Sequence, residues 1–131
     1  MQASAHETAM SGQRLAVAAE ALYLANLLIL PGAAFLILLV LYRRHACAAT
    51  PLARCHLRQT LAASLWAGLI LVAVNIAIVA LGGYRAPATC AIVVLYFTLC
   101  HAALVLFGVM GLAKAMAGQS YVYPLLGQRC E

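Results

Sequence analysis

The stretch from Arg43 to Arg58 places four of the chain's eight Lys and Arg residues between two long apolar runs. No charged residue occurs between positions 21 and 42 on one side of it, or between positions 59 and 84 on the other. Each run is as long as the ~20 residues that a helix needs to cross the hydrocarbon core of a bilayer. The pattern predicts a membrane hairpin in which the basic stretch is the turn.

Composition favours the same class of protein. Charged residues make up 8% of the 131 residues and apolar residues 66%, whereas a soluble domain carries roughly 25% charged residues. The formal net charge of +5 would suit nucleic acid in a soluble protein. Here the basic residues adjoin apolar runs, so their expected partner is the anionic cytoplasmic leaflet. We expect membrane lipids, and no nucleic acid, as partners.

Three apolar runs predict three transmembrane helices, at about residues 20–42, 60–81 and 88–113. The expected fold class is therefore an all-α membrane protein. Residues 1–14 are polar and are predicted to form a flexible tail, and residues 15–131 to form a single three-helix domain. The segment after the third run is expected to lie in the membrane interface.

Two features interrupt the first run. Glu20 stands at its start and is expected at the level of the lipid headgroups. Pro31-Gly32 lies near its middle, where proline removes a backbone donor and predicts a kink in a continuous helix. A membrane helix tolerates such a kink when a neighbouring helix satisfies the released carbonyl.

The basic residues predict an orientation, because short Lys- and Arg-rich segments stay on the cytoplasmic side. With three spans, only Arg14 and Arg85 fall on one side of the membrane. The basic residues on the other side are Arg43, Arg44, Arg54, Arg58, Lys114 and Arg129. This predicts an external N-terminus and a cytoplasmic C-terminus in a bacterial inner membrane.

Catalytic motifs are absent from the sequence. It contains no Ser-His-Asp set, no paired carboxylates and no phosphate-binding glycine loop, so we expect no enzyme and no cofactor. The five cysteines form no CxxC pair, and a Cys-His dipeptide is a poor chelate because adjacent helical residues diverge by about 100°. We expect no metal site, and cysteines that serve as small apolar filler.

His101 falls near the middle of the third run. Ionisable residues at that depth usually face the bundle interior and are candidates for function. The functional alternatives are axial ligation of a haem and a proton relay, but no second histidine lies at matching depth. The other alternative, which we favour, is a neutral imidazole hydrogen-bonded within the bundle. His101 thus remains only a weak candidate for cofactor binding.

Depth predicts further polar contacts. Asn26 and Asn75 lie equally far from the external ends of the first two runs, roughly 9 Å deep at 1.5 Å per residue. An unpaired amide there costs on the order of a few kcal/mol, so the two are expected to contact each other. By the same reasoning His101 is expected to face the Pro31 kink.

Two motifs resemble small uncharacterised bacterial integral membrane proteins. One is LARCHLRQTLAASLW at residues 52–66, and the other is AKAMAGQSYVYPL at residues 113–125. In those proteins a His, basic residues and a Gln precede a long span, and Tyr-x-Tyr-Pro follows the last one. They are distant relatives of the Tic protein-import channel subunit of the chloroplast inner envelope. The matching positions are His56, Arg58, Gln59, Ala115, Gly118, Tyr121, Tyr123 and Pro124.

We interpret the chain as an accessory or scaffold subunit of a larger membrane complex, whose partners are other membrane subunits or copies of itself. The resemblance implies an alternative, a transport or protein-translocation component that works as an oligomer. A third reading is a haem- or quinone-adjacent respiratory subunit. In each case we expect the tail to pack under the basic loop, with Tyr121 or Tyr123 at the headgroup level.

Overall fold

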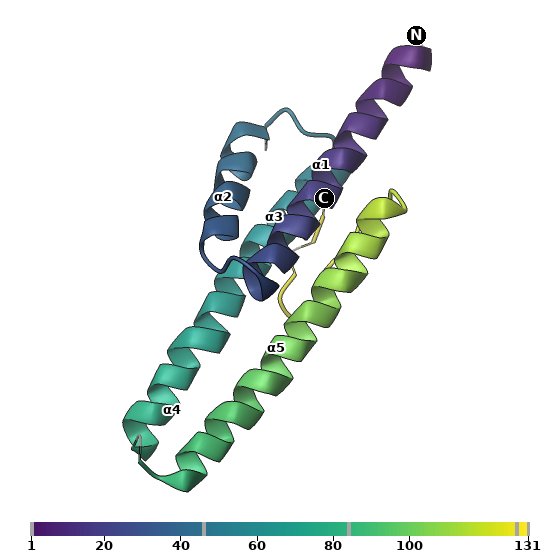
Figure 1. Cartoon of the computed structure of the whole chain (residues 1–131). Helices are drawn as coiled ribbons and strands as arrows, with labels where there is room; N and C mark the ends of the chain where they lie inside the picture. Colours follow the sequence, from purple (N-terminus) through teal and green to yellow (C-terminus); the bar gives the residue numbers. More distant parts are fainter. Residues whose placement is uncertain (1, 46, 84, 128, 131) are drawn as a thin grey trace.

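The computed structural model describes residues 2–45, 47–83, 85–127 and 129–130. Within those ranges the chain is helical and contains no β-strand. The elements are α1 (Gln2–Leu28), α2 (Ala33–His45), α3 (Pro51–Gly68), the π-helical segment η1 (Leu69–Ala73), α4 (Val74–Gly82) and α5 (Pro87–Met116). Figure 1 shows a short hairpin, α1 and α2, that lies along one half of a longer hairpin made of α3–η1–α4 and α5.

The chain reverses direction at Pro31-Gly32, so α1 and α2 are two separate antiparallel helices (Figure 1). Proline breaks the helix, and Gly32 takes a φ of +84°, which glycine adopts without a Cβ clash. The Asn26 side chain closes the turn, because its Oδ1 accepts a hydrogen bond from Gly32 N at 2.9 Å. The expectation of one kinked helix over residues 20–42 is therefore wrong, and a full turn stands in place of the kink.

Two helical segments in the described ranges are long and apolar enough to cross a membrane, Pro51–Gly82 and Pro87–Met116, each with a mean hydropathy of 2.4. They contain the second and third predicted spans. α2 has 13 residues and is about 20 Å long at 1.5 Å per residue, less than the ~30 Å of hydrocarbon. α1 extends back to Gln2, through the residues expected to form a flexible tail. An all-α fold with two candidate spans is supported, and a third span is not confirmed.

α3 begins inside the stretch that the sequence predicted to be a loop. Thr50 is its N-cap, since its Oγ1 accepts a hydrogen bond from Ala53 N at 3.3 Å. Pro51 follows at the first helical position, where a missing N–H costs nothing. The helix thereby places His56 and Gln59 on a buried face instead of leaving them in an exposed turn.

α1 packs closely against both α3 and α5. Close approach to α5 depends on two glycines of that helix: a Cβ on Gly108 would lie 2.7 Å from the Tyr23 ring, and one on Gly111 would meet the Glu20 carboxylate. Small residues at such positions let helix backbones approach each other. α1 is therefore the central helix at this end of the molecule, and its buried Ala19 and Tyr23 pack with buried residues of α2, α3 and the tail.

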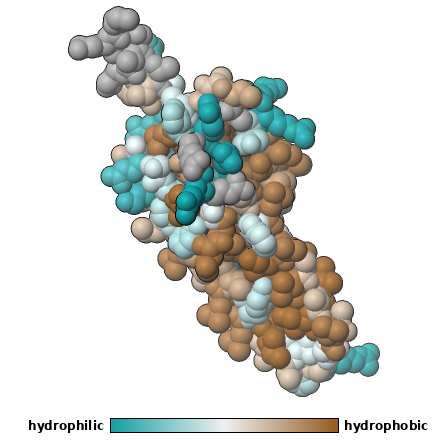
Figure 2. Space-filling model, turned by 180° about the vertical axis from the view of Figure 1, so that it is seen from behind, coloured by the Kyte–Doolittle hydropathy of each residue, from teal (hydrophilic) through white to brown (hydrophobic). Residues whose placement is uncertain are grey.

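Beyond the Pro31-Gly32 turn the longer hairpin has no third layer (Figure 1). No residue of η1 or α4 is buried, and neither is any residue of α5 between positions 90 and 103. We call η1, α4 and residues 87–100 the distal arm. Figure 2 shows an almost continuous apolar surface over this part of the molecule, while polar side chains gather at the opposite end.

Candidate functional site

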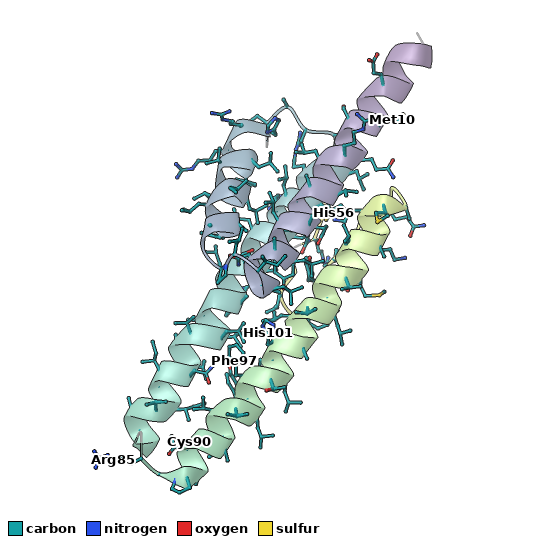
Figure 3. The ribbon with its side chains drawn as sticks, in the orientation of Figure 1. Met10, His56, Arg85, Cys90, Phe97 and His101 are labelled. Carbon is teal, nitrogen blue, oxygen red and sulfur yellow. A yellow bond between two sulfur atoms is a disulfide. The ribbon has the colours of Figure 1, made fainter. Side chains whose placement is uncertain are left out.

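Four buried side chains from α1, α3 and the tail come together in the core (His56 is labelled in Figure 3). Glu20 and Tyr23 belong to α1, His56 to α3, and Tyr123 to the tail that follows α5. Each exposes 1% or less of its surface. We call these four residues the Glu20 cluster.

The Glu20–His56 pair is neutral as a unit. His56 Nδ1 lies 2.6 Å from Glu20 Oε1, and His56 Nε2 lies 3.0 Å from the carbonyl oxygen of Gln119. A carbonyl oxygen only accepts, so Nε2 carries a proton. One further proton is then shared between Nδ1 and the carboxylate, which leaves no net charge on the pair. Pairing is what makes complete burial tolerable, because an uncompensated buried charge costs several kcal/mol.

The second carboxylate oxygen of Glu20 accepts a hydrogen bond from Tyr123. The Tyr123 hydroxyl donates to Glu20 Oε2, and the Tyr123 ring packs against Tyr23 with centroids 5.5 Å apart. Burial, and then the nearby Glu20 charge, raise the pKa of the Tyr123 hydroxyl, so it stays protonated and remains a donor. The Tyr23 hydroxyl donates to the carbonyl oxygen of Leu104 at 3.1 Å, which extends the cluster to α5.

The Glu20 cluster joins α1, α3, α5 and the tail through bonds that are all internal to the protein. Both carboxylate oxygens and both imidazole nitrogens have protein partners. None of the four side chains lines either of the cavities described below. The arrangement therefore stabilises the fold and presents no open position to a substrate.

The two motifs that carry the family resemblance meet at this cluster. His56 and the buried Gln59 come from the first motif, and Tyr121 and Tyr123 from the second. Gly118, with a φ of +68°, turns the chain after α5 so that the tail runs back toward α3. The expected packing of the tail against the basic stretch is confirmed at Cys55 and His56, but Tyr123 lies in the core.

Sequence reasoning missed the pairing of Glu20 with His56. A signal was present, because Glu20 is one of only three acidic residues and adjoins an uncharged run, where a carboxylate needs a partner. The sequence did not show that the chain reverses at Pro31-Gly32, and this reversal brings Glu20 to His56. Three continuous spans would have put the two residues on opposite faces of the membrane.

Cys55 and Cys130 form a disulfide that links α3 to the tail, with Cα atoms 5.2 Å apart. The expectation that the cysteines serve only as apolar filler is wrong for this pair. Spacing could not reveal it, since the two residues are 75 positions apart and meet only because the tail folds back. Cys47 is exposed and outside any disulfide.

A groove lies between the Pro31-Gly32 turn, α3 and α5. Its volume is about 460 Å³, and its lining includes Asn26, Pro31, Ser64, Phe97 and His101. His101 and Phe97 reach it from the middle of α5 (Figure 3). His101 and Pro31 thus line the same cavity, although Pro31 belongs to a turn and not to the expected kink.

Two polar groups in this groove lack partners. Ser64 Oγ and His101 Nδ1 are both buried and make no hydrogen bond within the described structure. The His101 ring is stacked on the Phe97 ring, with centroids 5.4 Å apart and planes 9° from parallel. The groove therefore combines a mostly apolar lining, a stacked pair of aromatic rings and two unpaired polar atoms.

The predicted contact between Asn26 and Asn75 is wrong. Asn26 caps the turn through Gly32, and Asn75 Nδ2 donates to the carbonyl oxygen of Leu71 at 2.6 Å, within its own helical segment. The two residues would lie at one depth only if the first run continued past Pro31 as a single helix. Because the chain reverses there, each asparagine bonds to nearby backbone instead.

A second cavity, of about 510 Å³, opens at the polar end of the molecule. Arg54, Arg58 and Arg129 line it together with the Cys55–Cys130 disulfide. The last motif position, Pro124, is exposed in the turn that follows Tyr123.

Comparison of the chain with protein-family models, curated proteins and solved structures yields no match. Within the described residues, no three His, Cys, Asp or Glu side chains gather as a metal site would require.

Proposed function

We propose that the chain is an integral membrane protein that serves as an accessory or scaffold subunit of a larger membrane complex. The distal arm is the observation that carries this proposal. It is only two helices thick, and no other described element of the chain covers it. Its exposed surface includes Ala73, Ala77 and Ala80, which recur at helical spacing on one side. Small residues in this pattern let a second transmembrane helix approach closely.

The same proposal includes an orientation. Seven of the eight basic residues belong to the end that carries the start of α3 and the tail, and Arg85 alone lies at the α4–α5 turn. If the longer hairpin crosses the membrane, the positive-inside rule places the basic end in the cytoplasm. Because α1 and α2 form a returning hairpin, the start of α1 also belongs on the cytoplasmic side. This replaces the external N-terminus that three spans implied.

Thiol labelling tests the orientation. Glu7 is exposed near the start of α1, and Arg85 is exposed at the distal turn. We expect native Cys47 and a Glu7→Cys variant to react with a membrane-impermeant reagent only after the membrane is opened. An Arg85→Cys variant should react in intact cells. External labelling of the Glu7→Cys variant would contradict the cytoplasmic placement of α1.

In this orientation the Cys55–Cys130 pair faces the reducing cytoplasm, where disulfides are rare. The tail must then be held by two hydrogen bonds, from His56 to the carbonyl oxygen of Gln119 and from Tyr123 to Glu20. The Tyr123–Glu20 bond is buried, the His56–Gln119 bond is partly buried, and neither involves the thiols.

Purification in a mild detergent tests the proposed role. We expect the wild-type chain to co-purify with a larger membrane protein at fixed stoichiometry. An Ala77→Ile variant keeps the surface apolar but blocks close approach, and should retain at least tenfold less partner. Ala102→Ile is the matched control, because Ala102 is exposed on α5 outside the distal arm. Equal retention by both variants would refute docking on the arm.

The alternative is a transport component that works as a homo-oligomer. It is favoured by the unpaired polar atoms of Ser64 and His101, which belong to the two candidate membrane spans and line the groove between them. The resemblance to relatives of an import-channel subunit supports it as well. Two spans cannot enclose a pathway, so this reading requires several copies. A native mass that is a multiple of 13.8 kDa, with no second protein, would favour it over the accessory role.

A further inference from the structure

We propose that the groove beside Pro31 binds the ring of a membrane quinone, with one ring carbonyl oxygen between Ser64 and His101. The inference needs only that the longer hairpin is embedded in a membrane. It does not depend on the docking of a protein partner on the distal arm, although Phe97 of that arm lines the groove.

The unpaired atoms define the chemistry of the ligand. Ser64 is 5% exposed, yet its hydroxyl has no hydrogen-bond partner, and His101 Nδ1 is buried without one. Native proteins rarely leave such atoms unpaired. A hydroxyl donates one proton, and a neutral imidazole donates from Nδ1 in one of its two tautomers. A carbonyl oxygen has two lone pairs and satisfies both donors at once.

The aromatic residues in the lining of the groove favour a flat ligand. The Phe97 and His101 rings, stacked on each other 9° from parallel, line the groove together with Phe35 and Pro31. Aromatic rings favour offset stacking on a planar partner. A volume of about 460 Å³ lies within the usual range of small-molecule sites. A quinone ring is planar and carries its carbonyl oxygens in the ring plane.

The depth of His101 along the helix favours a quinone over a phospholipid as the ligand. His101 stands near the middle of α5, roughly 20 Å from either end of that helix at 1.5 Å per residue. The ester carbonyls of phospholipids lie at the interface and do not reach this level. A quinone ring dissolves in the hydrocarbon, and its isoprenoid tail can remain in lipid outside the groove.

The test uses the full chain in nanodiscs of phosphatidylcholine and phosphatidylglycerol, free of quinone. A short-tailed ubiquinone analogue is titrated, and the quinone retained after gel filtration is counted per protein. We expect saturable binding near one per chain, with a matching rise in the midpoint of thermal unfolding. The Ser64→Ala and His101→Phe variants should each bind at least tenfold more weakly, and a Thr98→Val variant should bind normally. Thr98 is exposed on α5 and does not line the groove.

The thermal stability of the variants without quinone distinguishes a loss of binding from a loss of folding. Ser64→Ala removes an unpaired hydroxyl, so without quinone it should be at least as stable as the wild type. Quinone retention equal to that of empty nanodiscs, or unchanged in both groove variants, would overturn the proposal. A loss of stability in Ser64→Ala with unchanged binding would do so too, since it would show that the hydroxyl already has a partner within the protein.

Discussion

A Glu20→Ala substitution is expected to lower the free energy of unfolding by about 3–5 kcal/mol. It removes the carboxylate that pairs with His56 Nδ1 and accepts the Tyr123 hydroxyl, and all three residues are buried. His56 is then left in the core either charged and unpaired or with an unsatisfied nitrogen. Urea unfolding of the purified protein in detergent micelles measures the effect.

Two comparisons sharpen this prediction. Glu7→Ala removes an exposed carboxylate from the same helix and should change stability by less than about 0.5 kcal/mol. Combining Glu20→Leu with His56→Leu removes both members of the pair, so the double variant should lose less than the sum of the single losses. Additive losses would show that the two residues stabilise the fold independently and that the pairing is not what matters.

Deletion of residues 118–131 is expected to have a still larger effect, reducing the amount of folded, inserted protein to a small fraction of wild type. The deletion removes the buried Tyr123 ring and hydroxyl and the Gln119 carbonyl that accepts from His56. Loss of a buried aromatic side chain alone costs about 3–5 kcal/mol. Quantitative immunoblotting of membrane fractions, together with thermal unfolding, measures the outcome.

Point substitutions show which residues of the tail contribute to stability. Tyr123→Phe keeps the ring but leaves Glu20 Oε2 without its donor, so it should cost about 1–3 kcal/mol. Leu125→Gly should cost nothing, because Leu125 is fully exposed and has a positive φ of 67°, which glycine prefers. Wild-type abundance and stability in the deletion variant would mean that the tail is not part of the core.

Several features of the structure follow from local sequence. The two apolar runs after residue 59 predict helices, because uninterrupted apolar residues of that length have one favourable solution in lipid, in which every backbone group is bonded within the helix. Both runs lie in the two segments capable of crossing a membrane. His101 and Pro31 do line one groove, but the residue counts assumed the wrong direction for the first run, since α1 places Glu20 beside Gly111 and not beside the start of α5.

The remainder depended on how the chain folds back. Pro31-Gly32 is compatible with a kink or with a reversal, and the Asn26–Gly32 hydrogen bond that closes the reversal forms only once the chain has turned. The reversal brings Glu20 to the level of His56, and the returning tail brings Tyr123 to both. The sequence by itself determined the apolar helices and the basic end, because hydrophobicity and charge act residue by residue along the chain. Only the tertiary structure decided the Glu20 cluster, the Cys55–Cys130 bond and the groove, because each joins atoms whose distance depends on every turn between them.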